Sequence, residues 1–256
     1  MPVTLPAHAA AVLPFLRRSR EGAWATALVV GASAPDFSYV VRYVWPEASA
    51  QAHDLPGFLL FSLPAGLLLL LWLEALVLPA LRRTVPEVGG VQWGRFLRTG
   101  GLPRTPRGWG LVLVALGLGA ATHVLWDGFT HRHQWPAEAL YPHVRVPVGG
   151  RELPLARVLQ HGSSLVGSLL VLGYLAWRYP RLTPMRGGTL RAFLPVLGPT
   201  LAGALGGLAL RLVYFRDMGA LEAQLWWAFW PTVGGALVGL TLGCGLARWR
   251  SRREPV

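Results

Sequence analysis

The sequence predicts an all-α protein, a polytopic membrane bundle of about five spans with short interfacial helices at its N-terminus. Two observations predict this class. Of the 256 residues, 53% are hydrophobic and only 14% are charged, whereas a soluble domain has about a quarter of its residues charged. In addition, several apolar stretches approach the length of about 20 residues that a helix needs to cross a bilayer. They are Phe58–Pro79, Trp109–Trp126, Ser164–Tyr179, Ala192–Val213 and Leu225–Ala247.

Residues 1–57 precede these spans and are less uniformly apolar. Thr4 as N-cap and Pro6 in the first turn favour a short helix, which Pro14 would bend. A second apolar stretch, GAWATALVVGASAP, is too short to cross a bilayer alone and ends at Pro35. We therefore predict two short helices on or dipping into the membrane surface, with a sixth span as the alternative.

The spans themselves differ in character. The first, with GLLLLLWLEALVL, is apolar on all faces, and its one acid, Glu74, lies near an end where it is tolerated. The last two, within 192–247, are rich in Gly and Ala, which lets helices pack closely in lipid. In the loop of residues 128–163, VRVPVGGRELPL predicts a small hairpin around Gly149–Gly150. No boundary separates independently folding halves, so residues 1–256 are predicted to form one membrane domain, with the polar face on the three spans of 58–179.

The basic residues predict how the chain lies in the membrane. The net charge is +12, and all 24 basic residues are Arg. They stand in short clusters beside the spans, such as LRRT and RWRSRR, as membrane-flanking anchors do. A nucleic-acid-binding protein would instead gather them on one face, so we predict membrane lipids and no nucleic acid as partners. More arginines fall on the side of residues 80–108, 178–191 and the C-terminal tail, which predicts a multi-pass cell-membrane protein with a cytoplasmic C-terminus.

The histidines and aspartates are distributed unevenly. The single cysteine, Cys244, excludes an intrachain disulfide and a cysteine metal cluster, so any metal must use His and carboxylates. In the five-span arrangement all seven histidines lie on one side or at span ends that face it, and so do three of the four aspartates. The histidines are His8, His53, His123, His131, His133, His143 and His161, and the aspartates are Asp36, Asp54 and Asp127.

The stretch ATHVLWDGFTH combines two of these residue types at helical spacing. His123 and Asp127 are four residues apart and share one helix face, which His131 extends unless Gly128 ends the helix. Imidazole and carboxylate suit zinc, manganese or iron. A zinc site with an open position uses three protein ligands, and one pair supplies two. The remaining ligands are expected from distant segments on the same predicted face, namely His8, Asp36 and His53.

Alternatives remain open for several of these residues. Instead of binding a metal, His123 and His131 would neutralise Asp127 in a hydrogen-bonded network, because buried polar groups need partners whatever their role. His161, in LQHGSS, is a ligand, a residue that orients a ligand or an interfacial residue. Asp54 precedes LPGF and is well placed as the N-cap of the first span.

Five stretches together resemble an uncharacterised bacterial membrane family, classed as a domain of unknown function. They are LPAHAAAVLP, GASAPDFSYVVR, HDLPGFLLFSLPAGLLLLL, ATHVLWDGFTH and LQHGSSLVG. The resemblance covers the chain from its N-terminus to about residue 170. More loosely, their order looks like the membrane-bound metal-dependent hydrolases and the zinc-dependent phospholipase C superfamily. This resemblance implies five metal ligands, His8, Asp36, His53, His123 and Asp127.

One departure limits the metal count that the resemblance implies. The soluble phospholipases use a further His with a Glu four residues later, whereas His161 is followed at that spacing by Leu165. One or two divalent ions, with zinc favoured, are therefore expected. His161 stays a candidate ligand, Asp54 or His131 is the candidate general base, and Arg42 or Arg132 is placed to meet a phosphate.

The sequence thus favours a membrane-bound metal-dependent hydrolase that acts on a phosphoester or lipid headgroup, or on a related small molecule. The other interpretation is a non-catalytic membrane protein, such as a transporter, scaffold or assembly factor, with a structural polar cluster. A carrier should have polar groups along a path through its spans, and residues 192–247 contain almost none. Solvent access to the cluster separates the two, because a hydrolase needs an open coordination position.

Overall fold

The architecture is mainly helical, as predicted. A computed structural model describes residues 5–16, 22–42, 44–88, 91–92, 101–178, 189–214 and 221–253. Its strands form two small two-stranded sheets. Five helices within these ranges are long and apolar enough to cross a membrane, which marks the chain as a membrane protein. They are Leu55–Thr84, Pro106–Thr130, Leu155–Arg178, Leu190–Val213 and Trp227–Arg253.

The predicted spans coincide with these helices but are shorter. Helix α9 (Pro106–Thr130) continues through Gly128 and ends just before His131. Helix α11 (Leu155–Arg178) starts well before Ser164, because LARVLQ consists largely of good helix formers and follows Pro154. The predicted loop 128–163 is therefore shorter at both ends, and Tyr179 lies outside the described residues.

The N-terminal part consists of short helical segments. Pro14 has no N–H for the carbonyl of Ala10, and the chain tightens to a 3₁₀ turn just before it. Thr4, the expected N-cap, lies outside the part of the chain that the structure describes. The segments are α1 (Leu5–His8), η1 (Ala9–Val12), α2 (Leu13–Leu16), α3 (Ala23–Gly31), η2 (Pro35–Phe37), α4 (Ser38–Val41) and α5 (Pro46–Gln51).

The first long helix contains two π-helical turns, each of which directly precedes a segment with proline at its second residue. Pro64 and Pro79 give no N–H to the carbonyl four residues earlier, which explains why the helix widens there. The run consists of α6 (Leu55–Gly57), η3 (Phe58–Ser62), α7 (Leu63–Trp72), η4 (Leu73–Val77) and α8 (Leu78–Thr84).

The hairpin predicted around Gly149–Gly150 is confirmed. Strand β3 (Arg145–Val148) pairs antiparallel with β4 (Arg151–Pro154). Gly149 and Gly150 have φ values of 56° and 76°, and two positive φ angles in a two-residue loop are what a type I′ turn requires. A second small hairpin joins β1 (Glu87–Val88) to β2 (Val91–Gln92), and α10 (Ala137–Leu140) precedes β3.

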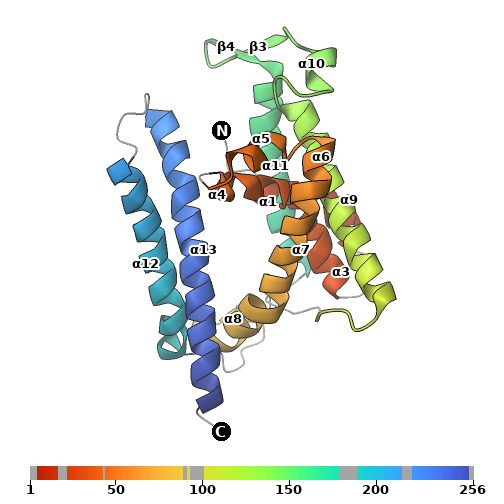
Figure 1. Ribbon diagram of the computed structural model, residues 1–256. Coiled ribbons are helices and arrows are strands. Elements are labelled where there is room, and N and C mark those ends of the chain that lie inside the picture. Colours follow the sequence, from red (N-terminus) through yellow and green to blue (C-terminus); the bar gives the residue numbers. More distant parts are fainter. Residues whose placement is uncertain are drawn as a thin grey trace. The chain divides into compact units, whose positions relative to one another are not determined.

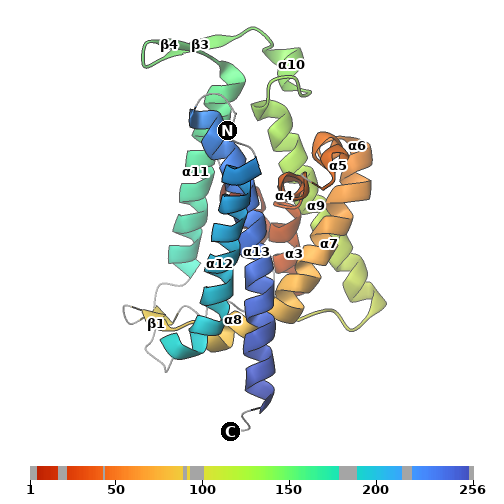
Figure 2. The same cartoon turned by 60° about the vertical axis from the view of Figure 1, so that its left-hand side comes forward.

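The chain divides into two compact units, and the prediction of a single domain stays a prediction. Unit 1 comprises Met1–Ser38, Glu47–Leu69 and Pro103–Pro180, and unit 2 comprises Tyr39–Pro46, Leu70–Leu102 and Arg181–Val256. In unit 2, α12 (Leu190–Tyr214) and α13 (Leu221–Arg253) lie side by side (Figures 1 and 2). A Cβ on Gly203 would overlap the carbonyl of Gly235, so the small residues do allow close helix packing, as predicted.

In unit 1, α9 packs against α3 and α11, and the short α1 packs against α11 (Figure 1). A single buried stripe runs along α9 and changes character near its C-terminal end. It begins with apolar side chains and ends with an imidazole and a carboxylate. Its residues include Val112, Leu116, Ala120, His123 and Asp127. The face of α9 that packs into unit 1 therefore also carries a buried histidine and a buried aspartate.

Candidate metal centre

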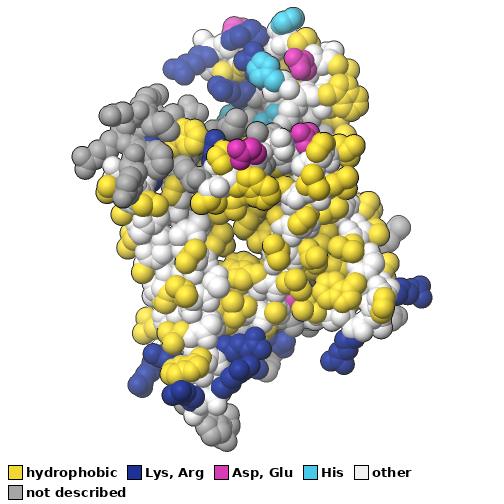
Figure 3. All heavy atoms as spheres, in the orientation of Figure 1, with side chains coloured by type: hydrophobic (Ala, Val, Ile, Leu, Met, Phe, Trp, Pro, Cys, Tyr) yellow, Lys and Arg dark blue, Asp and Glu magenta, His cyan; other side chains and the backbone are white. Residues whose placement is uncertain are grey.

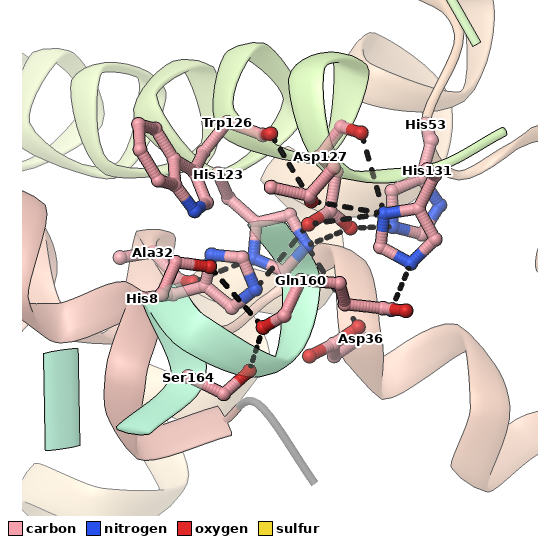
Figure 4. Close-up of polar contacts among 12 residues, drawn as sticks. His8, Ala32, Asp36, His53, His123, Trp126, Asp127, His131, Gln160 and Ser164 are labelled. Carbon is pink, nitrogen blue, oxygen red and sulfur yellow. Dashed lines mark hydrogen bonds and ion pairs between the residues drawn. The ribbon is translucent and has the colours of Figure 1, made fainter. Parts of the chain in front are cut away.

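Side chains from four distant segments meet at the polar end of this stripe (Figure 4). His123 and Asp127 come from α9, as their spacing predicted. His8 ends α1, Asp36 lies in η2, and His53 lies in the turn before α6. Asp36, His53, His123 and Asp127 each offer one ligand atom within 4.8 Å of the others, so this group could hold a metal ion.

Asp127 is the common partner in the group. Its Oδ1 is 3.4 Å from Nε2 of His8, and its Oδ2 is 3.4 Å from Nε2 of His53 and 3.3 Å from Nε2 of His123. Ordinary N–H···O hydrogen bonds are about 2.7–3.2 Å long. Two ligand atoms at about 2.0–2.1 Å from one tetrahedral zinc are separated by about 3.3–3.4 Å. The separations therefore suit atoms that share an ion better than atoms that share a proton.

The orientation of His123 is fixed by the backbone of another segment. Its Nδ1 lies 2.8 Å from the carbonyl oxygen of Ala32, which can only accept, so Nδ1 carries the hydrogen. In the neutral ring the lone pair is then on Nε2, which lies 3.3 Å from Asp127 and 3.7 Å from Oδ1 of Asp36. A lone pair and carboxylate oxygens repel one another unless a cation or a proton lies between them. Metal-binding histidines commonly donate their second N–H to a carbonyl in this way.

Burial also keeps His8 in the form that binds metals. Burial, together with the nearby His123, lowers the pKa of His8 to about 3, so its ring is neutral at pH 7. Its Nε2 is buried and makes no hydrogen bond to any residue that the structure describes. Burial raises the pKa of Asp36, against the opposing effect of His123. A divalent cation would offset the cost of burying the two aspartates beside the neutral ring of His8.

Two glycines let α3 come close enough to deliver the Ala32 carbonyl. A Cβ on Gly119 would overlap the carbonyl of Leu28 and lie 2.7 Å from the backbone nitrogen of Ala32. A Cβ on Gly31 would overlap the carbonyl of Leu116. The backbones of α3 and α9 are therefore in direct contact, and this contact sets the position of the His123 ring.

His131 is held beside the group by a residue that the sequence analysis missed. The side-chain nitrogen of Gln160 lies 2.7 Å from Nε2 of His131 and can only donate, so Nε2 accepts and Nδ1 carries the hydrogen. Nδ1 is 3.5 Å from Oδ1 of Asp127 and 3.3 Å from its carbonyl oxygen. His131 is therefore placed to orient Asp127. Gln160 lies on the buried face of α11 with Ala156, Ser164 and Gly167, a helical spacing that could have identified it.

Gln160→Ala is expected to weaken metal binding without abolishing it. The substitution removes the donor that fixes the His131 ring, and loss of a residue that orients a ligand costs about 10–100-fold in metal affinity. Competition with a zinc-binding dye would measure the change. His161→Ala, at the next position of α11, is the control, since His161 is exposed and outside the group. Equal affinities for Gln160→Ala and the parent would contradict the role given to His131.

The remaining predicted site residues do not belong to the group. His161 is exposed on α11, whereas Gln160 and Ser164 are buried. Asp54 is exposed and caps α6, where its Oδ1 accepts the backbone N–H of Gly57 at 2.7 Å, as the N-cap interpretation predicted. Arg42 belongs to unit 2 and lies 4.2 Å over the ring of Trp227.

Two cavities lie near the candidate centre in unit 1. One, of about 20 Å³, is bordered by His8, Asp127 and Gln160 and is large enough for one water molecule. The other, of about 150 Å³, is lined by polar side chains together with alanines and prolines of the segment that follows α9. They include Arg132, His133, Glu138, Tyr141 and His143.

Five long apolar helices and a buried group of histidines and aspartates define an integral membrane protein with a candidate metal centre. The model of the Domain of unknown function (DUF4184) family matches residues 1–244, and the chain belongs to this family. No curated protein and no solved structure matches the chain. The resemblance to an uncharacterised family is thus confirmed, and a relation to hydrolases stays a prediction.

Proposed function

We propose that His8, Asp36, His53, His123 and Asp127 hold a divalent metal ion, and that the protein is a membrane-bound metal-dependent hydrolase. The substrate class that we propose is a phosphoester, including the headgroup of a lipid. The observation that carries the proposal is the convergence of the Nε2 atoms of three histidines on two buried aspartates at separations of 3.3–3.7 Å.

The donor set decides which ions fit. It contains imidazole nitrogens and carboxylate oxygens and no sulfur, which suits zinc first and also iron or manganese. Asp127 directs one oxygen to His8 and the other to His53 and His123. A carboxylate that binds through both oxygens can coordinate one ion or bridge two. The sequence likewise led us to expect one or two ions.

The residues around the group supply what hydrolysis requires. A divalent ion lowers the pKa of a coordinated water and polarises the phosphoryl or carbonyl group under attack. The cavity beside His8 and Asp127 has room for that water. His131 remains the better candidate for a general base, because Asp54 is engaged as a helix cap. The lone pair of His131 is on Nε2, so this role requires that the Gln160 amide release that nitrogen. Arg132, which lines the larger cavity, is the candidate phosphate-binding residue.

The test is hydrolysis of bis(p-nitrophenyl) phosphate by full-length protein in detergent, after reloading with zinc, manganese or iron(II). The parent is expected to release nitrophenolate, and His53→Gln is expected to lower the rate by about 100-fold or more, since it removes a ligand and not only a supporting residue. His161→Gln is the matched control, because that histidine is exposed and outside the group.

Two outcomes would count against the proposal in different ways. A metal-loaded parent that cleaves neither this diester nor phospholipid vesicles would leave a metal centre without hydrolytic activity, as in a non-catalytic membrane protein. Equal rates for the parent and His53→Gln would show that the observed hydrolysis does not occur at this group.

A further inference from the structure

We propose a second, separate site in unit 2, which binds a phosphate group, most simply that of an anionic membrane lipid. It is a cavity of about 260 Å³ between α8 and the C-terminal end of α13. Three arginines and two hydroxyl side chains contribute to its wall. The lining residues are Pro79, Ala80, Arg83, Thr84, Ala247, Arg248, Ser251 and Arg252.

The local structure holds one of these arginines in place. Pro79 has no N–H for the carbonyl of Ala75, and the guanidinium of Arg248 donates to that oxygen at 2.8 Å. A bond of this kind fixes one end of the planar group and leaves its other N–H donors for a ligand. The proline that widens the helix at η4 therefore also positions a donor at the cavity.

The positive charge of the cavity favours the binding of an anion. Arg83, Arg248 and Arg252 contribute three positive charges, and no carboxylate is among the residues that line the cavity. Like charges gathered in one cavity repel, and an anion offsets that repulsion. A guanidinium presents a fork of N–H donors that matches two phosphate oxygens. Thr84 and Ser251 donate their hydroxyl hydrogens to the carbonyls of Ala80 and Arg248, so the arginines are the main donors.

The cavity lies where a lipid headgroup would be. It adjoins the ends of two apolar helices that are long enough to span a membrane. Arginine side chains gather around the lower end of α13, below a surface of hydrophobic and uncharged atoms (Figure 3). Basic pockets between spans at this depth bind the phosphates of anionic lipids. Membrane anchoring alone accounts for arginines outside the cavity, such as Arg253 over the ring of Trp249 at 4.1 Å, but not for three that share one cavity.

The experiment compares two triple variants with the same loss of charge from the same two helices. The pocket variant combines Arg83→Gln, Arg248→Gln and Arg252→Gln. The control combines Arg82→Gln, Arg250→Gln and Arg253→Gln, none of which lines the cavity. Full-length protein in detergent is titrated with phosphatidylglycerol, with phosphatidylcholine and with inorganic phosphate, and bound ligand is counted by native mass spectrometry. We expect phosphatidylglycerol to bind the parent and the control, and to bind the pocket variant at least about 10-fold more weakly.

The outcomes separate the sources of the phosphate and the competing explanation. If inorganic phosphate binds as tightly as phosphatidylglycerol and is lost in the pocket variant alone, the cavity still binds phosphate, and its natural ligand is soluble. Equal losses in both triple variants, or no loss in either, would overturn the proposal. Equal losses would leave only the general attraction of a basic surface, and no loss in either would mean that the lipid binds elsewhere. Thermal unfolding of the pocket variant in detergent checks that it folds.

Discussion

Asp127→Asn is expected to abolish zinc binding while leaving the metal-free fold almost as stable as that of the parent. Asp127 contacts four imidazoles, and its oxygens lie 3.3–3.5 Å from nitrogens of His8, His53, His123 and His131. Asparagine keeps the volume and one acceptor oxygen but removes the negative charge. Metal affinity is expected to fall by more than the roughly 100-fold limit for a residue that only orients a ligand.

Thermal unfolding separates the two interpretations of the cluster. Zinc at about 100 times its Kd stabilises a protein that binds it only when folded by about 2.7 kcal/mol. Zinc should therefore raise the Tm of the parent and not that of Asp127→Asn, whereas chelator should bring the two together. If the histidines instead neutralise a buried carboxylate, breaking the pair costs about 3–5 kcal/mol. The variant would then be much less stable than the parent even in chelator.

Gly119→Val is expected to be the most damaging substitution away from the ligands themselves. Its side chain would overlap the carbonyl of Leu28 and press on the backbone nitrogen of Ala32, 2.7 Å from the new Cβ. The clash is with backbone, so α3 must move away from α9. Overpacking costs about 1–3 kcal/mol or more, and the movement also withdraws the Ala32 carbonyl from His123. We expect both a lower Tm in detergent and weaker zinc binding.

Gly110→Val is the matched control on the same helix. A Cβ on Gly110 meets nothing within 4 Å, and valine in place of glycine slightly favours a helix. Its Tm and zinc affinity should equal or exceed those of the parent. Similar losses in both variants would show that valine disturbs α9 itself, and the contact with α3 would then not be what positions His123.

Composition and periodicity predict the fold well because they depend on the solvent that each helix faces. Long apolar runs identify all five spans, and alternation with two glycines identifies the hairpin of β3 and β4. The ends of the helices are less predictable. Polar residues are compatible with a helix that continues beyond the apolar run, and α11 accordingly begins at Leu155 rather than at Ser164.

The candidate site could be predicted in part. The spacing of His123 and Asp127 is enough to predict that they share a helix face. The sequence also put His8, Asp36 and His53 on the same side of the membrane as this pair, and in the structure all five side chains meet. Which face of α11 turns inward depends on its packing against α1, where a Cβ on Gly167 would lie 2.8 Å from the carbonyl of Ala7. His161 was a candidate ligand or an interfacial residue by sequence, and in the structure it is exposed while its neighbour Gln160 is buried.

The metal content of the purified protein tests the central claim most directly. Full-length protein, extracted gently in detergent, would be dialysed against zinc and then against metal-free buffer, and its bound metals counted by elemental mass spectrometry. The proposed centre predicts about one or two equivalents of zinc per chain in the parent and almost none in Asp127→Asn. A parent that folds but retains no zinc, manganese or iron before or after reloading would contradict it. His8, Asp36, His53, His123 and Asp127 would then form a structural polar network.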